Sequence, residues 1–155
     1  VTASACALGI ALRLRRDAFP LKPDGTLVLL HSLRRSFAQA PYASMFRALR
    51  AARDTGELSD AESRAGADER ALAAYRAGEA CHPLLPYADW AGCAPARGRL
   101  GRVVVAGCRD APAARAMGFV PSHGIGSALD MARGVAGGGT TAVLLGPPYP
   151  ALLVG

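Results

Sequence analysis

Short apolar runs along the chain predict β-strands, and the most informative of them is Val-Val-Val-Ala at residues 103–106. β-Branched residues without polar alternation are typical of a strand that is buried on both faces of a parallel sheet. Apolar runs at residues 26–30 and 140–145 predict two further strands, and residues 119–120 predict a brief extended piece. The chain therefore carries several short strands of the kind found in sheets covered by helices.

Between these runs, apolar residues recur every three to four positions, which is the helical period. Residues 41–53 follow this period behind a proline suited to the first turn of a helix. Residues 59–77 begin with a cap-like Ser-Asp-Ala-Glu, which predicts one helix ending near Gly78. The helical segment expected at residues 83–90 is closely bounded by Pro86 and Pro95. The further segments that we expect to be helical are residues 5–16, 83–90, 111–117 and 125–133.

The order of these elements favours an α/β fold, namely a three-layer domain with a mainly parallel sheet flanked by helices. With 155 residues, the chain is expected to form a single domain over residues 1–155 that buries roughly 70% of its unfolded surface. Ligands of open α/β sheets usually lie outside the carboxyl ends of the strands. The loop at residues 107–110 is therefore expected to border the functional surface.

Composition narrows the setting of the protein. Although 51% of the residues are hydrophobic, no apolar stretch reaches the ~18 residues of a membrane span. Arginines follow the mildly apolar start of the chain instead of preceding it, which argues against a signal peptide. The four cysteines form no close pair, which suits reduced thiols. We expect a cytoplasmic protein without a membrane partner and, since the chain starts inside an apparent helix without methionine, part of a longer polypeptide.

A net charge of +6 raises the question of a nucleic-acid partner. Lys22 is the only lysine beside seventeen arginines, and asparagine is absent, which is typical of GC-rich coding. The arginines are spread over several predicted helices and are expected to pair with nearby acids, as in Asp68-Glu69-Arg70, and they form no stripe with interleaved aromatic residues. We expect no nucleic-acid partner. The alternative hypothesis is a basic domain that binds an anionic polymer, and a binding affinity that falls steeply with salt concentration would reveal it.

Motifs with the spacing of known catalytic or metal sites are scarce. Cys81, His82 and Cys93 would supply three metal ligands, but structural zinc sites favour ligand pairs two to four residues apart, and a turn role for His82 is the alternative. Residues 107–110 lack the glycine spacing of a dinucleotide fingerprint, and the chain has no Gly-x-Ser-x-Gly elbow. We therefore expect no metal ligands, and for His123 only a place before a helix.

Polar residues at the exit of the strand at residues 26–30 are the candidates for chemistry. His31 stands where an acid/base or hydrogen-bonding role is possible, with a capping or solvated histidine as the alternative. Ser32 lies beside it. Arg34, with Arg35, carries guanidinium groups that suit a carboxylate or a phosphate, and a solvated basic face is the alternative.

Four features follow one another along the chain: Trp90, the apolar strand at residues 103–106, Met-Gly-Phe-x-Pro at residues 117–121, and an Ala-Leu helix at residues 127–132. With the opening Val-Thr-Ala and the earlier strand, nearly the whole chain resembles the C-terminal half of the nickel-dependent lactate racemase family. The resemblance implies a two-domain enzyme that interconverts stereoisomers of a 2-hydroxy acid with a nickel pincer nucleotide.

In that family the cofactor is attached to a lysine of the N-terminal domain, where one histidine binds nickel and further histidines serve as acid and base. The cofactor accepts a hydride from the α-carbon of the substrate and returns it to the other face of the keto acid. A closed, water-poor cleft between the two domains keeps the keto acid from escaping. The implied partners are therefore a small 2-hydroxy acid and the N-terminal cofactor domain of the same polypeptide.

The cofactor domain has no counterpart in this sequence, so the chain alone is not expected to racemise a substrate. Of the family's residues, only Trp90 carries over, as a residue facing substrate and cofactor, with a core or interface aromatic as the alternative. A second hypothesis for the whole chain is a non-catalytic α/β ligand-binding or scaffolding module, since no set of acid, base and nucleophile is present.

Overall fold

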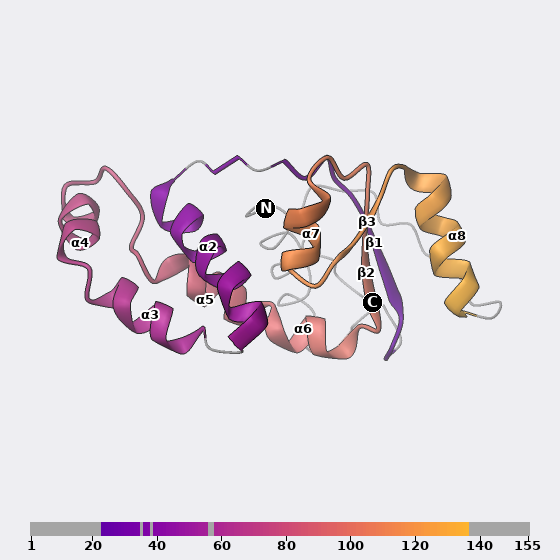
Figure 1. The fold of residues 1–155 in the computed structure, drawn as a ribbon, viewed down its shortest axis with the longest axis horizontal. Coiled ribbons are helices and arrows are strands. Elements are labelled where there is room, and N and C mark those ends of the chain that lie inside the picture. Colours follow the sequence, from indigo (N-terminus) through magenta and orange to yellow (C-terminus); the bar gives the residue numbers. More distant parts are fainter. Residues whose placement is uncertain (1–22, 35, 38, 56–57, 137–155) are drawn as a thin grey trace, which may run out of the picture.

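A three-stranded parallel sheet forms the centre of the computed structural model, which describes residues 23–34, 36–37, 39–55 and 58–136 (Figure 1). The strand order is β1-β2-β3, with β1 at Thr26–Leu30, β2 at Arg102–Ala106 and β3 at Val120–Ser122. The predicted parallel arrangement of the strands is confirmed: β1 pairs with β2, and the extended piece predicted after them joins the same sheet as β3. The predicted helix at 5–16 and strand at 140–145 lie outside the described residues.

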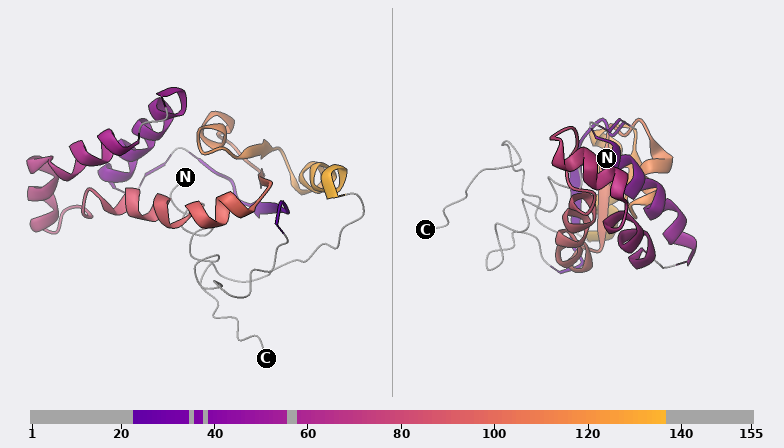
Figure 2. Two further views of the ribbon diagram at one scale, coloured as in Figure 1. Left: turned by 90° about the horizontal axis from the view of Figure 1, so that it is seen from below. Right: turned by 90° about the vertical axis from the view of Figure 1, so that its left-hand side faces the viewer.

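Helices cover both faces of this sheet, so the α/β three-layer fold is confirmed (Figures 1 and 2). The helix α8 lies on one face, and α2 and α7 lie on the other. The two crossover connections have the same handedness, as is usual between parallel strands: the first runs through α2 to α6 and the second through α7. The helices are α2 (Ala40–Thr55), α3 (Ser59–Gly66), α4 (Glu69–Arg76), α5 (Leu85–Gly92), α6 (Ala94–Arg99), α7 (Ala111–Ala116) and α8 (Ile125–Ala136).

The middle strand β2 carries the core. Val104 and Val105 are 0% exposed and point to opposite faces, so each belongs to a different apolar cluster. Val105 belongs to the first apolar cluster, with Phe46 of α2 and residues of α7, whereas Val104 belongs to the second, with Ala128 of α8. A strand buried on both faces is what the unbroken apolar run predicted.

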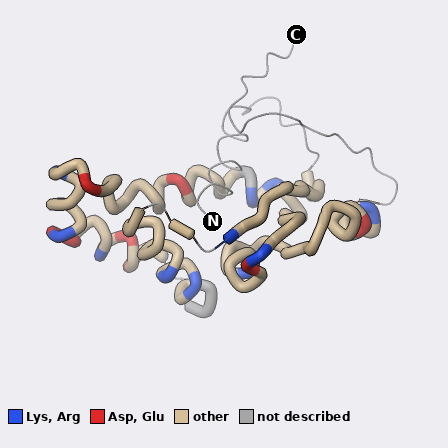
Figure 3. Tube along the Cα trace, turned by 90° about the horizontal axis from the view of Figure 1, so that it is seen from above, with Lys and Arg blue, Asp and Glu red and all other residues tan. Residues whose placement is uncertain are grey.

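The charged residues are interspersed along the described chain, as Figure 3 shows from above. The described ion pairs are exposed: Glu69 lies 3.7 Å from Arg76, and Asp130 lies 3.8 Å from Arg133. Within Asp68-Glu69-Arg70 the acids therefore do not pair with the neighbouring arginine side chain, contrary to the sequence interpretation. Over the described residues, the charged side chains are scattered, as the sequence analysis expected from the lack of a basic stripe.

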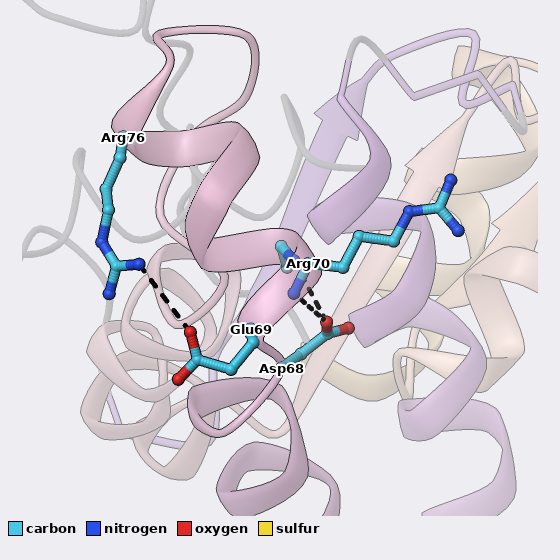
Figure 4. Close-up of polar contacts among 5 residues, drawn as sticks. Asp68, Glu69, Arg70 and Arg76 are labelled. Carbon is cyan, nitrogen blue, oxygen red and sulfur yellow. Dashed lines mark hydrogen bonds and ion pairs between the residues drawn. The ribbon is translucent and has the colours of Figure 1, made fainter.

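The predicted helix at residues 59–77 is wrong in one respect, because the structure contains two helices, α3 and α4, separated at residues 67–68. Asp68 has extended backbone, and its carboxylate accepts hydrogen bonds from the backbone N–H groups of Arg70 and Ala71, both at 3.1 Å (Figure 4). An aspartate in this position starts a new helix because it satisfies N–H groups that lack a partner within the helix.

The helix predicted at residues 83–90 corresponds to α5, and a further helix that the sequence did not predict, α6, follows it after Cys93. Pro86 and Pro95 do not bound a helix, as the sequence interpretation held; each is the second residue of one. Proline fits there because its missing N–H is not needed in the first turn. The other helices and strands match the predicted segments within a few residues at each end. None of the described helices combines the length and apolar character of a membrane span.

Candidate functional site

The carboxyl ends of the three strands lie level with one another, because Leu30 pairs with Ala106 and Ala106 pairs with Ser122. The chain leaves the sheet here through three loops, which start at His31, Gly107 and His123. These loops lie along the upper edge of the sheet in Figure 1. The surface expected from the sequence is therefore an edge shared by three loops, two of which follow buried strand ends.

Backbone hydrogen bonds join the three loops into one rim. The N–H of His31 donates to the Ala106 carbonyl at 3.1 Å, and the N–H groups of Gly107 and Cys108 both donate to the Ser122 carbonyl, at 3.0 and 3.1 Å. Gly107 has φ +80°, a left-handed conformation that favours glycine and turns the chain sharply at the strand end. The backbone positions of the rim are thus set by the sheet itself.

The third loop leads directly into α8. Ser122 is 4% exposed, and its hydroxyl donates to the Gly124 carbonyl at 3.0 Å. The same carbonyl accepts the N–H of Ala128 at 3.1 Å, so α8 begins at this edge of the sheet. His123 precedes the helix, as predicted, and is exposed. The positive end of the α8 dipole therefore points toward the rim.

The second loop contributes structure more than chemistry. The Asp110 carboxylate accepts the N–H of Ala113 at 2.9 Å and so caps the start of α7. Cys108 is partly buried and packs against the first apolar cluster, and Arg109 is exposed. The side chains of the loop at residues 107–110 therefore mainly hold α7 against the sheet.

His31 is the most specifically placed side chain of the rim. Its Nδ1 accepts the backbone N–H of Leu33 at 3.0 Å, and Leu33 is itself 0% exposed. Burial lowers the pKa of His31 from its ordinary value of 6.5. The imidazole is therefore neutral at pH 7, with its proton on Nε2, since Nδ1 uses its lone pair as an acceptor.

Ser32 and Arg34 stand on the same loop as His31 and are exposed. The N–H of Ser36 donates to the Arg34 carbonyl at 2.8 Å, which keeps this part of the loop in a tight turn. Arg35 lies outside the described residues. The three predicted site residues therefore share one loop, whose first residue, His31, is hydrogen-bonded to the Ala106 carbonyl.

Trp90 belongs to another part of the molecule. It is partly buried on α5 and packs against the first apolar cluster, and the guanidinium carbon of Arg97 lies 3.9 Å from its ring centroid. Arg97 belongs to α6, which leads into the amino end of β2. These contacts are those of a packing aromatic with a cation–π partner. The structure does not bring Trp90 to the rim that holds His31.

The alternative metal ligands Cys81, His82 and Cys93 have other contacts. His82 Nδ1 accepts the N–H of Leu84 at 3.2 Å, as expected of a turn residue, and the Cys93 thiol donates to the Asp89 carbonyl at 3.2 Å. Across the described part of the chain, no three His, Cys, Asp or Glu side chains gather as metal ligands would.

Sequence reasoning missed two features of the rim. Ser122 and Gly124 tie the third loop to α8, and the Gly-Ile-Gly at residues 124–126 after an extended piece was the available signal. The Nδ1 contact of His31 had no signal in the sequence, because it depends on the turn that follows.

No protein-family model, curated protein or solved structure shows a significant match to this chain.

Proposed function

We propose that this chain supplies one wall of the active-site cleft of a nickel-pincer-dependent 2-hydroxy acid racemase or epimerase and is inactive alone. The observation that carries the proposal is the rim at the carboxyl edge of the parallel sheet, where His31, Ser32 and Arg34 share one loop. Open α/β sheets bind ligands at this edge. The carboxylate of a hydroxy acid can accept hydrogen bonds from an arginine side chain and from neutral donors of the protein.

The described residues do not themselves fit the cofactor. They contain no cluster of metal ligands, and the only lysine of the sequence, Lys22, lies outside them. Nickel and the pincer nucleotide are therefore assigned to the N-terminal domain that the family resemblance implies. The contribution of this chain is to bind the carboxylate, to exclude water and to orient the substrate toward that domain.

The proposal is tested with the complete polypeptide, produced together with the enzymes that make the nickel pincer nucleotide. Pure D- and L-lactate and a panel of longer 2-hydroxy acids are supplied separately, and chiral chromatography follows the appearance of the opposite stereoisomer. We expect interconversion in both directions for at least one acid. If no acid is interconverted but calorimetry detects its binding, the chain is a non-catalytic ligand-binding module; if neither occurs, both hypotheses are wrong.

A matched pair of arginine variants locates the substrate. Arg34→Gln removes a guanidinium at the rim, and we expect it to raise KM about tenfold, which corresponds to ~1.4 kcal/mol of lost binding. Arg133→Gln removes another exposed guanidinium, near the far end of α8, where it pairs only weakly with Asp130. Equal KM values for the two variants would remove Arg34 from the site.

A further inference from the structure

We propose that the outer edge of β1 is a docking edge for the apolar run at residues 140–145 of this chain, which joins the sheet as a further parallel strand. The strand order is then residues 140–145, β1, β2 and β3. This inference concerns the sheet and does not depend on the proposed racemase.

The two outer strands of the described sheet differ in how they are built. β3 is three residues long and has Pro121 in its middle, paired with Val105 of β2. Short strands and prolines protect an exposed sheet edge, because proline has no N–H to offer to a further strand. β3 therefore has the features of a natural edge strand.

β1 lacks this protection. Its five residues, Thr-Leu-Val-Leu-Leu, include no charge and no proline, and an open apolar edge of this kind is a template for aggregation. Leu30 is 68% exposed and Val28 is only partly buried, whereas Val104 and Val105 of the neighbouring β2 are fully buried. β1 thus has the composition of an inner strand, although it has a neighbour on one side only among the described strands.

The backbone of β1 also has hydrogen-bonding groups on its outer side. The N–H of His31 donates to the Ala106 carbonyl of β2 at 3.1 Å. Successive N–H groups of a strand point to opposite sides, so those of Val28 and Leu30 point away from β2. Val28 packs against the apolar cluster under α8, and Leu30 shares its face of the sheet. A strand beside β1 can therefore pair with two residues and cover the exposed Leu30 side chain.

The path of the chain leads to the edge of β1 and not to that of β3. The crossovers from β1 to β2 and from β2 to β3 run over the face covered by α2 and α7, whereas α8 covers the other face. Crossovers between parallel strands keep the same hand. A crossover of that hand over the opposite face moves the chain in the opposite direction, from β3 back toward β1. Because β1 and β2 already pair with each other, the next position lies beyond β1.

The end of α8 is placed for this return. α8 starts at the carboxyl edge of the sheet and packs against all three strands, most extensively against β1 (Figure 1). Its twelve residues rise ~18 Å, about the length of β1, so Ala136 lies toward the amino edge, where a parallel strand must begin. The Gly-Gly-Gly at residues 137–139 has a length within the range of about two to six residues that is usual between a helix and a strand.

The added strand has a consequence for the rim. The chain leaves β1 toward the face of α2, while the strand on the other side of β1 is reached over the face of α8. The strand order therefore reverses at β1, and open α/β sheets bind ligands at the carboxyl end of such a reversal. Of the three loops of the rim, this singles out the loop that starts at His31.

Nuclear Overhauser contacts in the complete polypeptide, labelled with nitrogen-15 and carbon-13, test the pairing directly. We expect contacts between the backbone hydrogens of residues 141–144 and those of residues 27–30, with both segments running in the same direction. Absence of these contacts, pairing of residues 140–145 with β3, or an antiparallel order beside β1 would overturn the proposal. Pairing of β1 with residues 1–22 or, in a mixture of differently labelled copies, with a second copy would also overturn it.

Amide exchange of Val28 and Leu30 shows whether this run covers the edge. Val143→Pro removes a donor from the middle of the run, and we expect it to speed the exchange of both amides at least tenfold while Val104 stays protected. Val154→Pro is the matched control beyond the run and should leave these rates unchanged. Equal exchange rates in the two variants would overturn the proposal, and the wild-type contacts decide the question if Val143→Pro does not fold.

These outcomes separate the two proposals, because neither measurement uses an enzymatic reaction. The expected contacts without interconversion of any hydroxy acid overturn only the racemase. Interconversion without contacts between β1 and residues 141–144 overturns only the added strand.

Discussion

Gly101 lies just before β2, where this segment packs tightly against the segment before β1. A Cβ at this position would lie 2.5 Å from the carbonyl oxygen of Asp24 and 3.0 Å from its carbonyl carbon. Both are backbone atoms, and two hydrogen bonds hold this crossing: Asp24 N–H to the Arg99 carbonyl at 2.9 Å, and Gly101 N–H to the Gly25 carbonyl at 3.2 Å. We therefore expect Gly101→Ala to lower the free energy of unfolding by about 1–3 kcal/mol.

Urea denaturation measures this change as a lower midpoint. Gly98→Ala is the matched control, because a Cβ at Gly98 meets no atom within 4 Å and the residue lies within α6. Alanine favours a helix over glycine by up to ~1 kcal/mol, so this control should be neutral or more stable. A Gly101→Ala variant as stable as the wild type would show that the two segments are farther apart.

His31 couples stability to pH. Its pKa lies below 6.5 in the folded protein, because burial disfavours the charged ring, and returns to about 6.5 on unfolding. Between these two values the unfolded state binds more protons, so acid favours unfolding. The stability contributed by neutral His31 is therefore complete above pH ~6.5 and is lost as pH falls through the lower folded-state value.

The wild type and His31→Asn are compared by urea denaturation from pH 4.5 to pH 8. The variant keeps an acceptor for the Leu33 N–H but does not titrate, so the difference in unfolding free energy should be constant above neutrality and should shift against the wild type as the pH drops below 6.5. A difference that does not vary with pH would mean that the ring titrates normally in the fold.

At the level of single elements, the start of α4 separates the effect of a cap from that of an ion pair. Asp68 accepts two backbone N–H groups, whereas Glu69 forms an exposed ion pair with Arg76 at 3.7 Å. We expect Asp68→Ala to cost about 0.5–2 kcal/mol of unfolding free energy. Glu69→Gln removes the exposed ion pair and a negative charge in the first turn of α4, and should lower it by less, about 0.3–1 kcal/mol.

Circular dichroism and urea titration of the two variants provide the measurement. A Glu69→Gln variant that loses as much helix as Asp68→Ala would place the stability of α4 in its ion pair. The expected order instead follows from solvation, because water screens the exposed pair while the orphan N–H groups of the helix gain a fixed acceptor.

Across the whole molecule, stability is expected to fall with distance from the sheet. β2 is buried on both faces, whereas α3 and α4 contain no buried residue and lie at the end of the molecule farthest from α8 (Figures 1 and 2). Few buried contacts allow a segment to open without unfolding the rest. Hydrogen exchange should therefore be much faster for amides of α3 and α4 than for those of β2.

Amide exchange followed by NMR checks this gradient. Helix α2 serves as the control, because it is a helix of the same molecule but contributes Phe46 to the core. Its amides should be protected more strongly than those of α3. Equal protection of α3, α4 and β2 would show that the molecule opens only as one cooperative unit.

Much of this fold could be predicted from local patterns. The valines of β2 are buried on both faces, and the parallel pairing of β1 with β2 follows the expectation for an unbroken apolar run. The break between α3 and α4 was missed because Asp68 reads equally well as an exposed helix residue. Its capping role depends on the extended backbone of that one residue, which helical periodicity does not report.

The candidate site shows the same division. Placing His31, Ser32 and Arg34 at the exit of a strand required only the order of residues, since a polar loop must follow where the apolar run ends. The nitrogen that carries the proton of His31, the seating of Trp90 under Arg97, and the tie from Ser122 to Gly124 needed three-dimensional packing. Burial preference is a property of each residue type and its period, whereas a hydrogen bond or a shared edge depends on where the backbone places two groups relative to each other.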